Sequence, residues 1–260
     1  MSESVRARPV DSAIPSGYED IPREVIRLRA RRKAIARNME AARQVPCLTA
    51  DMQIDLSELL AARAEHNAAV GADGKVSILA FLARAAVSAL GEFPGLNATY
   101  AGNAVLQWTP VNLAVAVDSP GGLVVPVIAD AQRMNVVQIG TRIAELAARA
   151  REGALGLEDL AGGTFTLSNP GSVGPVLRAE ALLNPPQVAL LGLPGLKKIP
   201  VVVTSLEGED QVAVRTVVCP SLTFDHRVID GAEVVRFLDA MRHRVEGWAL
   251  HDYMETPAIA

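Results

Sequence analysis

The stretch that most constrains the fold of this chain runs over residues 221–232, with the sequence SLTFDHRVIDGA. An apolar run with the character of a strand stops at His226, and an amphipathic segment begins just beyond Gly231. This pattern predicts a strand that turns into a helix, which would hold the histidine at a rigid corner. A histidine pKa of ~6.5 allows proton transfer near neutral pH, so His226 is a candidate general base. Taken alone, the spacing favours a structural, half-buried histidine.

The rest of the chain alternates between patterns typical of strands and of helices. Apolar and polar residues alternate over 48–55, which predicts a strand with one buried face. Ser77 can cap a helix that reaches about residue 91, and its apolar stripe should cover a sheet. Because several strands are neighbours in sequence, part of this sheet should be antiparallel. Further helices are predicted over 23–43, 56–66, 136–151 and 232–245, and further strands over 98–100, 105–108, 113–117, 123–128, 164–167, 198–204 and 211–218.

The composition is typical of one large, slightly acidic globular domain. With 260 residues, of which 50% are hydrophobic and 21% charged, and a net charge of −4, the chain can bury a substantial core. This balance argues against disorder and against nucleic acid as a partner. We expect a flexible N-terminal lead-in at 1–22, a folded domain at 23–247 and a C-terminal tail at 248–260.

Cysteine usage and hydropathy indicate the environment of the protein. Cys47 and Cys219 lack the spacing of metal ligands and cannot build a framework of several bridges, so we expect no metal site and a reducing compartment. No apolar run reaches the ~18 residues that a membrane-spanning helix needs. The N-terminus mixes acidic and basic residues without an apolar signal core. These features predict a cytoplasmic protein without membrane contact.

Five segments together resemble one known family. The run 225–231, DHRVIDG, resembles the signature of the dihydrolipoamide acyltransferases, the core components of 2-oxo acid dehydrogenase complexes, and is similar to the shorter motif of chloramphenicol acetyltransferase. Other segments resemble parts of the same catalytic domain, in the family's order: 32–39 (RKAIARNM), 122–128 (GLVVPVI), 163–171 (GTFTLSNPG) and 184–189 (NPPQVA). The resemblance covers about residues 23 to 247 and favours a catalytic His226 over a structural one.

The resemblance implies a fold and a reaction. The fold is α/β, an α+β two-layer sandwich like that of chloramphenicol acetyltransferase, with a mixed sheet covered by helices. The reaction moves an acyl group between a dihydrolipoyl thiol and coenzyme A, which is a substrate. His226 would act as the general base and Ser168 as the hydroxyl that donates to the oxyanion. Asp230 would support the catalytic corner through an ion pair, for example to Arg29 or Arg32.

The same resemblance implies partners. The family builds homotrimers in which the base of one subunit faces the donor serine of its neighbour. The resemblance does not decide whether such trimers join into a larger cage. The lipoyl group would come from a carrier on another domain or chain, because only about 22 residues precede the catalytic segment and they hold no Asp-Lys-Ala-type hairpin. The 2-oxo acid dehydrogenase and dihydrolipoamide dehydrogenase components would be further partners.

Two other classes of function stay open at this point. One is an acyl-CoA-dependent transferase with an amine or hydroxyl acceptor, which chloramphenicol acetyltransferase exemplifies with similar histidine and serine chemistry. The other is a scaffold that assembles partners without catalysis, against which the intact His226, Asp230 and Ser168 argue. Pro170 and Ser172 stand where many family members carry an apolar residue, so the loop beside Ser168 departs from the family pattern.

Overall fold

A mixed six-stranded sheet forms the centre of the protein. The computed structural model describes residues 14–71, 74–205 and 207–255. The strand order is β1 (Cys47–Asp51), β11 (Ser221–Asp225), β8 (Ala189–Gly192), β7 (Phe165–Ser168), β5 (Leu113–Val115) and β6 (Val127–Ile128). β7 runs parallel to β5 and β8, and all other neighbours in this sheet are antiparallel. The predicted mixed sheet is therefore confirmed.

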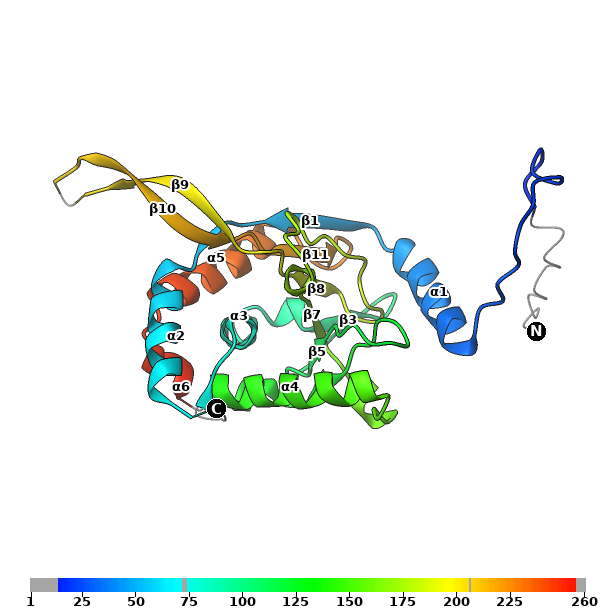
Figure 1. Cartoon of the computed structure of the whole chain (residues 1–260), viewed down its shortest axis with the longest axis horizontal. Coiled ribbons are helices and arrows are strands. Elements are labelled where there is room, and N and C mark those ends of the chain that lie inside the picture. Colours follow the sequence, from blue (N-terminus) through cyan, green and yellow to red (C-terminus); the bar gives the residue numbers. More distant parts are fainter. Residues whose placement is uncertain (1–13, 72–73, 206, 256–260) are drawn as a thin grey trace.

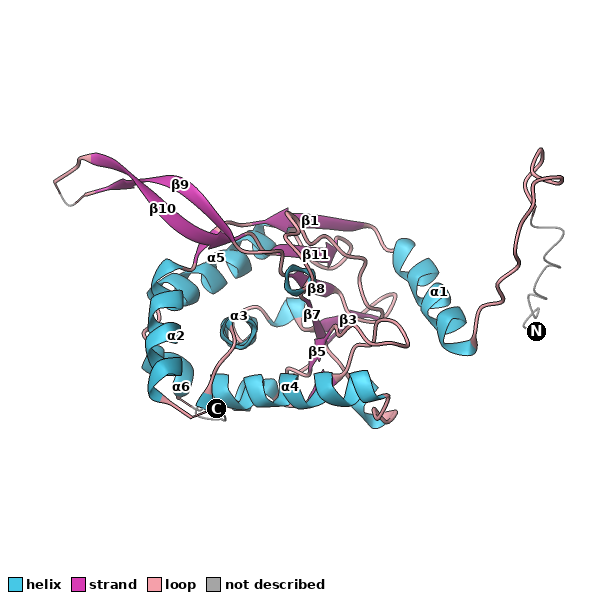
Figure 2. Cartoon of the chain, viewed as in Figure 1, coloured by secondary structure: helices cyan, strands magenta, loops and turns pink. Residues whose placement is uncertain are grey.

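Two smaller sheets and six α-helices complete the described fold (Figures 1 and 2). One small sheet joins β2 (Ile54–Asp55), β10 (Asp210–Val218) and β9 (Lys197–Thr204), and the other pairs β3 (Ala98–Tyr100) with β4 (Val105–Gln107). Figure 1 shows the β9–β10 ribbon and α1 projecting from opposite ends of the body. The helices are α1 (Ala30–Arg43), α2 (Ser57–Ala69), α3 (Ile78–Leu90), α4 (Val136–Glu152), α5 (Gly231–Gly247) and α6 (Leu250–Met254).

The helix α3 is the centre of the helical layer. The Ser77 Oγ accepts a hydrogen bond of 3.1 Å from the Ala80 N–H, so the predicted cap is present. Ten of its thirteen residues are buried, Arg84 among them, so other parts of the protein surround the helix on most sides. Within the described residues, no helix is long and apolar enough to cross a bilayer.

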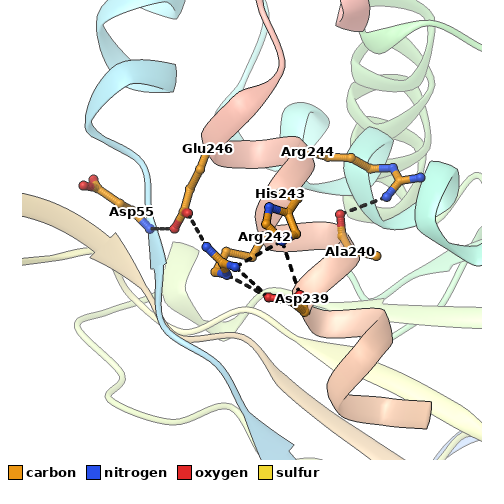
Figure 3. Close-up of polar contacts among 7 residues, drawn as sticks. All are labelled: Asp55, Asp239, Ala240, Arg242, His243, Arg244 and Glu246. Carbon is orange, nitrogen blue, oxygen red and sulfur yellow. Dashed lines mark hydrogen bonds and ion pairs between the residues drawn. The ribbon is translucent and has the colours of Figure 1, made fainter. Parts of the chain in front are cut away.

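The helix α5 is tied to the β9–β10–β2 sheet and to α3 by polar contacts (Figure 3). Arg242 lies between Asp239 and Glu246, donating to their carboxylates at 2.7 and 2.8 Å. The Glu246 carboxylate in turn accepts the backbone N–H of Asp55 in β2 at 3.0 Å. On the other side, the Arg244 Nε donates to the Ser88 Oγ of α3 at 3.1 Å. These contacts hold the β9–β10–β2 sheet and α3 to the same helix.

Two terminal elements differ from the sequence-based expectation. We predicted a helix over 23–43, but α1 begins at Ala30, and residues 23–29 are exposed without regular structure. In this protomer only Ala42 of α1 is buried, and helices depend on tertiary packing for most of their stability, so a high helix propensity alone does not extend the helix. At the other end, the expected tail at 248–260 contains the packed helix α6, whose Tyr253 is fully buried.

Tyr253 closes the core beneath α3 and α5. Its ring packs edge-on against Phe81, with centroids 4.8 Å apart, and against Trp248, with centroids 5.0 Å apart. Its hydroxyl donates to the backbone carbonyl of Arg244 at 3.1 Å. Burial raises the pKa of this phenol well above its usual range, so the group stays neutral at physiological pH.

We predict that Tyr253→Ala lowers the free energy of unfolding by about 3–5 kcal/mol, as expected when a buried aromatic side chain is truncated. Tyr253→Phe should cost only about 1 kcal/mol, because it removes one hydrogen bond and keeps the ring. Urea unfolding at matched protein concentration measures both changes. A Tyr253→Ala protein as stable as the wild type would show that α6 is no part of the core.

Candidate functional site

His226 stands at a corner that the backbone fixes on both sides. The last residue of β11, Asp225, donates its N–H to the Val188 carbonyl at 2.8 Å, and the His226 N–H donates to the Pro46 carbonyl at 3.0 Å. The Asp225 carbonyl accepts the N–H groups of Val228 and Ile229, both at 3.1 Å. The histidine ring is exposed and lies 5.4 Å from the ring of Phe224. The predicted strand-to-helix corner is therefore present.

The residues on either side of His226 form an ion pair. Arg227 donates from Nε at 2.9 Å and from Nη2 at 2.6 Å to the two carboxylate oxygens of Asp225. This hydrogen bonding raises the pKa of the Arg227 guanidinium. The guanidinium also lies 4.1 Å from the ring centroid of Tyr100. Neither neighbour of His226 carries a predicted role, although both stand in the motif that carries the resemblance.

Ser168 ends β7 at a different corner. Its carbonyl accepts the Leu193 N–H at 2.7 Å, and the short helix η6 (Pro170–Ser172) follows directly. Gly171 of this helix packs directly on the backbone of Pro194 and Gly195, where an added Cβ would clash. A cavity of about 200 Å³ opens beside the loop, between η6 and the first turns of α3. The loop that departs from the family pattern is thus packed, through Gly171, against the backbone of Pro194 and Gly195.

The strand register places Ser168 and His226 far apart within one protomer. Ser168 lies opposite Gly192 of β8, and Gly192 lies opposite Ser221 at the start of β11. His226 follows the other end of β11, five residues beyond Ser221. At a rise of roughly 3.3 Å per residue, the two side chains are separated by about 17 Å along the strands. One protomer therefore cannot present both side chains to the same reacting atom.

Asp230 precedes α5 but makes no side-chain cap to that helix. Its side chain is exposed, and within the described part of the protomer it forms no ion pair with Arg29 or Arg32. Arg31 of the same basic segment instead donates to the Gly122 carbonyl at 2.9 Å. The expected ion pair of Asp230 therefore stays a prediction.

Metal chemistry has no support in the described residues. Across 14–71, 74–205 and 207–255, no group of three or more histidine, cysteine or acidic side chains could hold a metal ion. Cys47 and Cys219 are both free thiols, and burial raises the pKa of each above its ordinary value. Neither is therefore a ready thiolate at neutral pH.

Comparison with known proteins gives a consistent result. The family described as 2-oxoacid dehydrogenases acyltransferase (catalytic domain) matches residues 21–251. The acetyltransferase component of pyruvate dehydrogenase complex from Mycobacterium bovis is 37% identical over 84% of this chain and 40% of its own length. The succinyltransferase component of 2-oxoglutarate dehydrogenase complex from Pseudomonas aeruginosa is 33% identical over 91% of this chain and 57% of its own length. The chain thus spans about half the length of these relatives.

Solved structures show the same similarity. The dihydrolipoamide acetyltransferase of Azotobacter vinelandii, studied for the catalytic roles of a serine, a histidine and an asparagine, superposes with a TM-score of 0.82. It is 30% identical and covers 90% of this chain and 96% of its own. The cubic core of the pyruvate dehydrogenase multienzyme complex superposes with a TM-score of 0.80 at 31% identity, covering 93% of this chain and 97% of its own.

We predict that Gly171→Ala destabilises the protein by about 1–3 kcal/mol, because the new Cβ must displace backbone rather than a movable side chain. Gly174→Ala, three residues further along the same loop, is the matched control. A Cβ at Gly174 would meet open space, so its effect should stay within ~0.5 kcal/mol. Equal melting temperatures for the two variants would contradict the close packing of η6.

Proposed function

This chain belongs to the 2-oxoacid dehydrogenases acyltransferase family, and we propose that it moves an acyl group between a dihydrolipoyl thiol and coenzyme A. The observation that supports this most strongly is the fixed corner that presents an exposed His226 at the end of a fully buried strand. In this proposal residues 23–247 form the catalytic domain, with a lead-in at 1–22 and a terminal segment at 248–260 whose helix α6 packs into the core of that domain. Coenzyme A and the lipoyl group are substrates brought to the site.

His226 acts as the general base in this proposal. A free thiol has a pKa of ~8.5 and attacks well only as the thiolate, so a base must take the S–H proton near neutral pH. The imidazole of His226 accepts that proton, and the sulfur attacks the carbonyl carbon of the thioester. When the tetrahedral intermediate collapses, the C–S bond to the other thiol breaks, and His226 returns the proton to the departing sulfur. Protons and charges then balance over one turnover.

Ser168 stabilises the negative charge that develops on the carbonyl oxygen. A hydroxyl donor aimed at an oxyanion is worth about 3 kcal/mol in transition-state energy. Because Ser168 and His226 lie at opposite ends of the sheet in one protomer, they can serve one reaction only if two subunits share a site. We propose that this assembly is the homotrimer that the family resemblance implies, in which the histidine of each subunit faces the serine of its neighbour.

Exposed apolar side chains support this assembly. Ile26 of the N-terminal arm is 78% exposed, and Val212 of the β9–β10 ribbon is 75% exposed. Both segments project from the body in Figure 1, and apolar groups in such positions are commonly covered by a subunit interface. A solved relative is the cubic core of a multienzyme complex, which is a large assembly. The proposed site requires a neighbouring subunit, whereas a cage is a further level that the site does not require.

The remaining partners follow from the same proposal. A lipoyl carrier on another domain or chain delivers the acyl group, and the 2-oxo acid dehydrogenase and dihydrolipoamide dehydrogenase components act before and after it. We propose the cytoplasm as the location, because both cysteines of the chain are free thiols, as expected in a reducing compartment.

We predict that His226→Ala lowers kcat at least ~100-fold with little change in KM, because the base acts in the transition state. Ser168→Ala should lower kcat by about tenfold to a thousandfold with a similar KM. Steady-state assays with acetyl-CoA or succinyl-CoA and free dihydrolipoamide measure both, and an amine acceptor should give no product. Near-normal turnover of His226→Ala would refute its role as the base.

We also predict that the two inactive variants complement each other. In trimers assembled at random from equal amounts of His226→Ala and Ser168→Ala subunits, roughly one interface in four joins an intact histidine to an intact serine. Co-expression should therefore restore about a quarter of wild-type activity. Light scattering should show trimers for each variant alone and for the mixture. Mixed trimers without recovered activity would show that the two residues do not share a site across subunits.

A further inference from the structure

The ion pair beside His226 closes a small hydrogen-bonded loop that spans the backbone of the histidine. Asp225 is 2% exposed, and its carboxylate accepts both side-chain bonds of Arg227 as well as the Arg227 backbone N–H at 3.0 Å. Arg227 thus contacts Asp225 through main chain and side chain together. Because Asp225 and Arg227 flank His226, this hydrogen-bonded loop restricts the backbone dihedral angles of His226. The histidine ring forms no hydrogen bond within the described residues, so its direction depends on this backbone and on the neighbouring ring of Phe224.

Tyr100 covers the outer face of the Arg227 guanidinium. The distance of 4.1 Å between the guanidinium carbon and the ring centroid is that of a close cation–π contact. The Arg227 side chain is 39% exposed, so without the ring, water would compete more freely for the guanidinium that Asp225 holds. The Tyr100 hydroxyl has no hydrogen-bond partner among the described residues. The ring face is therefore the part of Tyr100 that contacts Arg227.

The backbone that carries Tyr100 is connected directly to the catalytic corner. In β3, the carbonyl of Ala98 accepts the Val188 N–H at 3.3 Å. The carbonyl of Val188 accepts the Asp225 N–H at 2.8 Å. The side chain of Trp108, beyond β4, donates to the Thr99 hydroxyl at 3.1 Å and braces the hairpin from its other strand. Ala98, two residues before Tyr100 in β3, and Asp225 are thus both hydrogen-bonded to Val188.

We propose that Tyr100 is a positioning residue for His226, acting through Arg227 and Asp225. The ring holds the guanidinium in place, the guanidinium and the Asp225 carboxylate fix the turn, and the turn aims the imidazole. The effect on turnover rests on the proposed acyl transfer, whereas the effect on the histidine ring does not. Tyr100 itself touches no reacting atom in this scheme.

The test compares Tyr100→Leu, which removes the aromatic face, with Tyr100→Phe, which keeps it. Tyr100→Leu should lower kcat roughly two- to tenfold with unchanged KM for coenzyme A and dihydrolipoamide, in keeping with the strength of a partly exposed cation–π contact. Tyr100→Phe should restore wild-type kcat. In histidine-labelled protein, the NMR signal of the His226 ring should shift or broaden in Tyr100→Leu and match the wild type in Tyr100→Phe.

Trp248→Leu is the matched control at a distant pair of the same kind. Trp248 lies 5.4 Å from the guanidinium of Arg84 on the α3–α6 side of the molecule. Its loss should lower the melting temperature and leave both kcat and the His226 signal unchanged. This control separates a general loss of stability from a loss of histidine positioning.

Three outcomes would overturn the proposal. They are wild-type kcat and a wild-type His226 signal in Tyr100→Leu, an equal loss in Tyr100→Phe, or the same loss in Trp248→Leu. If Tyr100→Leu does not fold, kcat and the His226 NMR signal are measured in Arg227→Lys instead. Lysine keeps the charge but cannot bond both carboxylate oxygens, so wild-type values in this variant would also overturn the proposal. A protein without transferase activity would refute the proposed function, and the NMR signal would still test the role of Tyr100.

Discussion

The hydrogen-bonded placement of β11 between β1 and β8 is the constraint on which the rest of the structure depends. All five residues of β11 are buried, and both of its edges are paired. A strand in this position cannot slip by one residue without turning its buried side chains to the opposite face. The positions of its two ends are therefore fixed relative to β1 and β8. One end carries His226, and the other lies in register with Ser168 through Gly192.

This rigidity has a consequence for catalysis. In the proposed reaction, this short strand would hold the base accurately at its end, but it also keeps the two corners of the sheet about five residues apart. An active site that needs both corners must then be completed by another copy of the chain. The projecting arm and ribbon, with their exposed apolar side chains, are suited to bring such a copy into place. In this proposal, the formation of the site and the assembly of the subunits would both follow from the register of one sheet.

The apolar core and the charged pairs of the protein lie in different places. The core beneath α3 consists of apolar and aromatic side chains, and Tyr253 is the case in which a buried hydroxyl finds a backbone acceptor. Charged pairs lie around this core, for example between Arg215 and Asp55 in the β9–β10–β2 sheet and between Arg227 and Asp225 at the corner of His226. Exposed ion pairs add little stability, whereas a bidentate arginine–carboxylate pair restricts direction. The bidentate pair of Asp225 and Arg227 is therefore suited to fix the orientation of the turn at His226.

The sequence by itself determined the local elements and the candidate side chains. The cap at Ser77, the 198–218 hairpin and the strand-to-helix corner at His226 depend on neighbouring residues and were predictable for that reason. The start of α1 at Ala30 and the burial of Tyr253 depend on what the tertiary structure offers as a packing surface. Tyr100 and Arg227 meet only because β3 is hydrogen-bonded beside the segment that precedes β8. Contacts between residues so distant in sequence leave no periodic signal, so only the tertiary structure decided them.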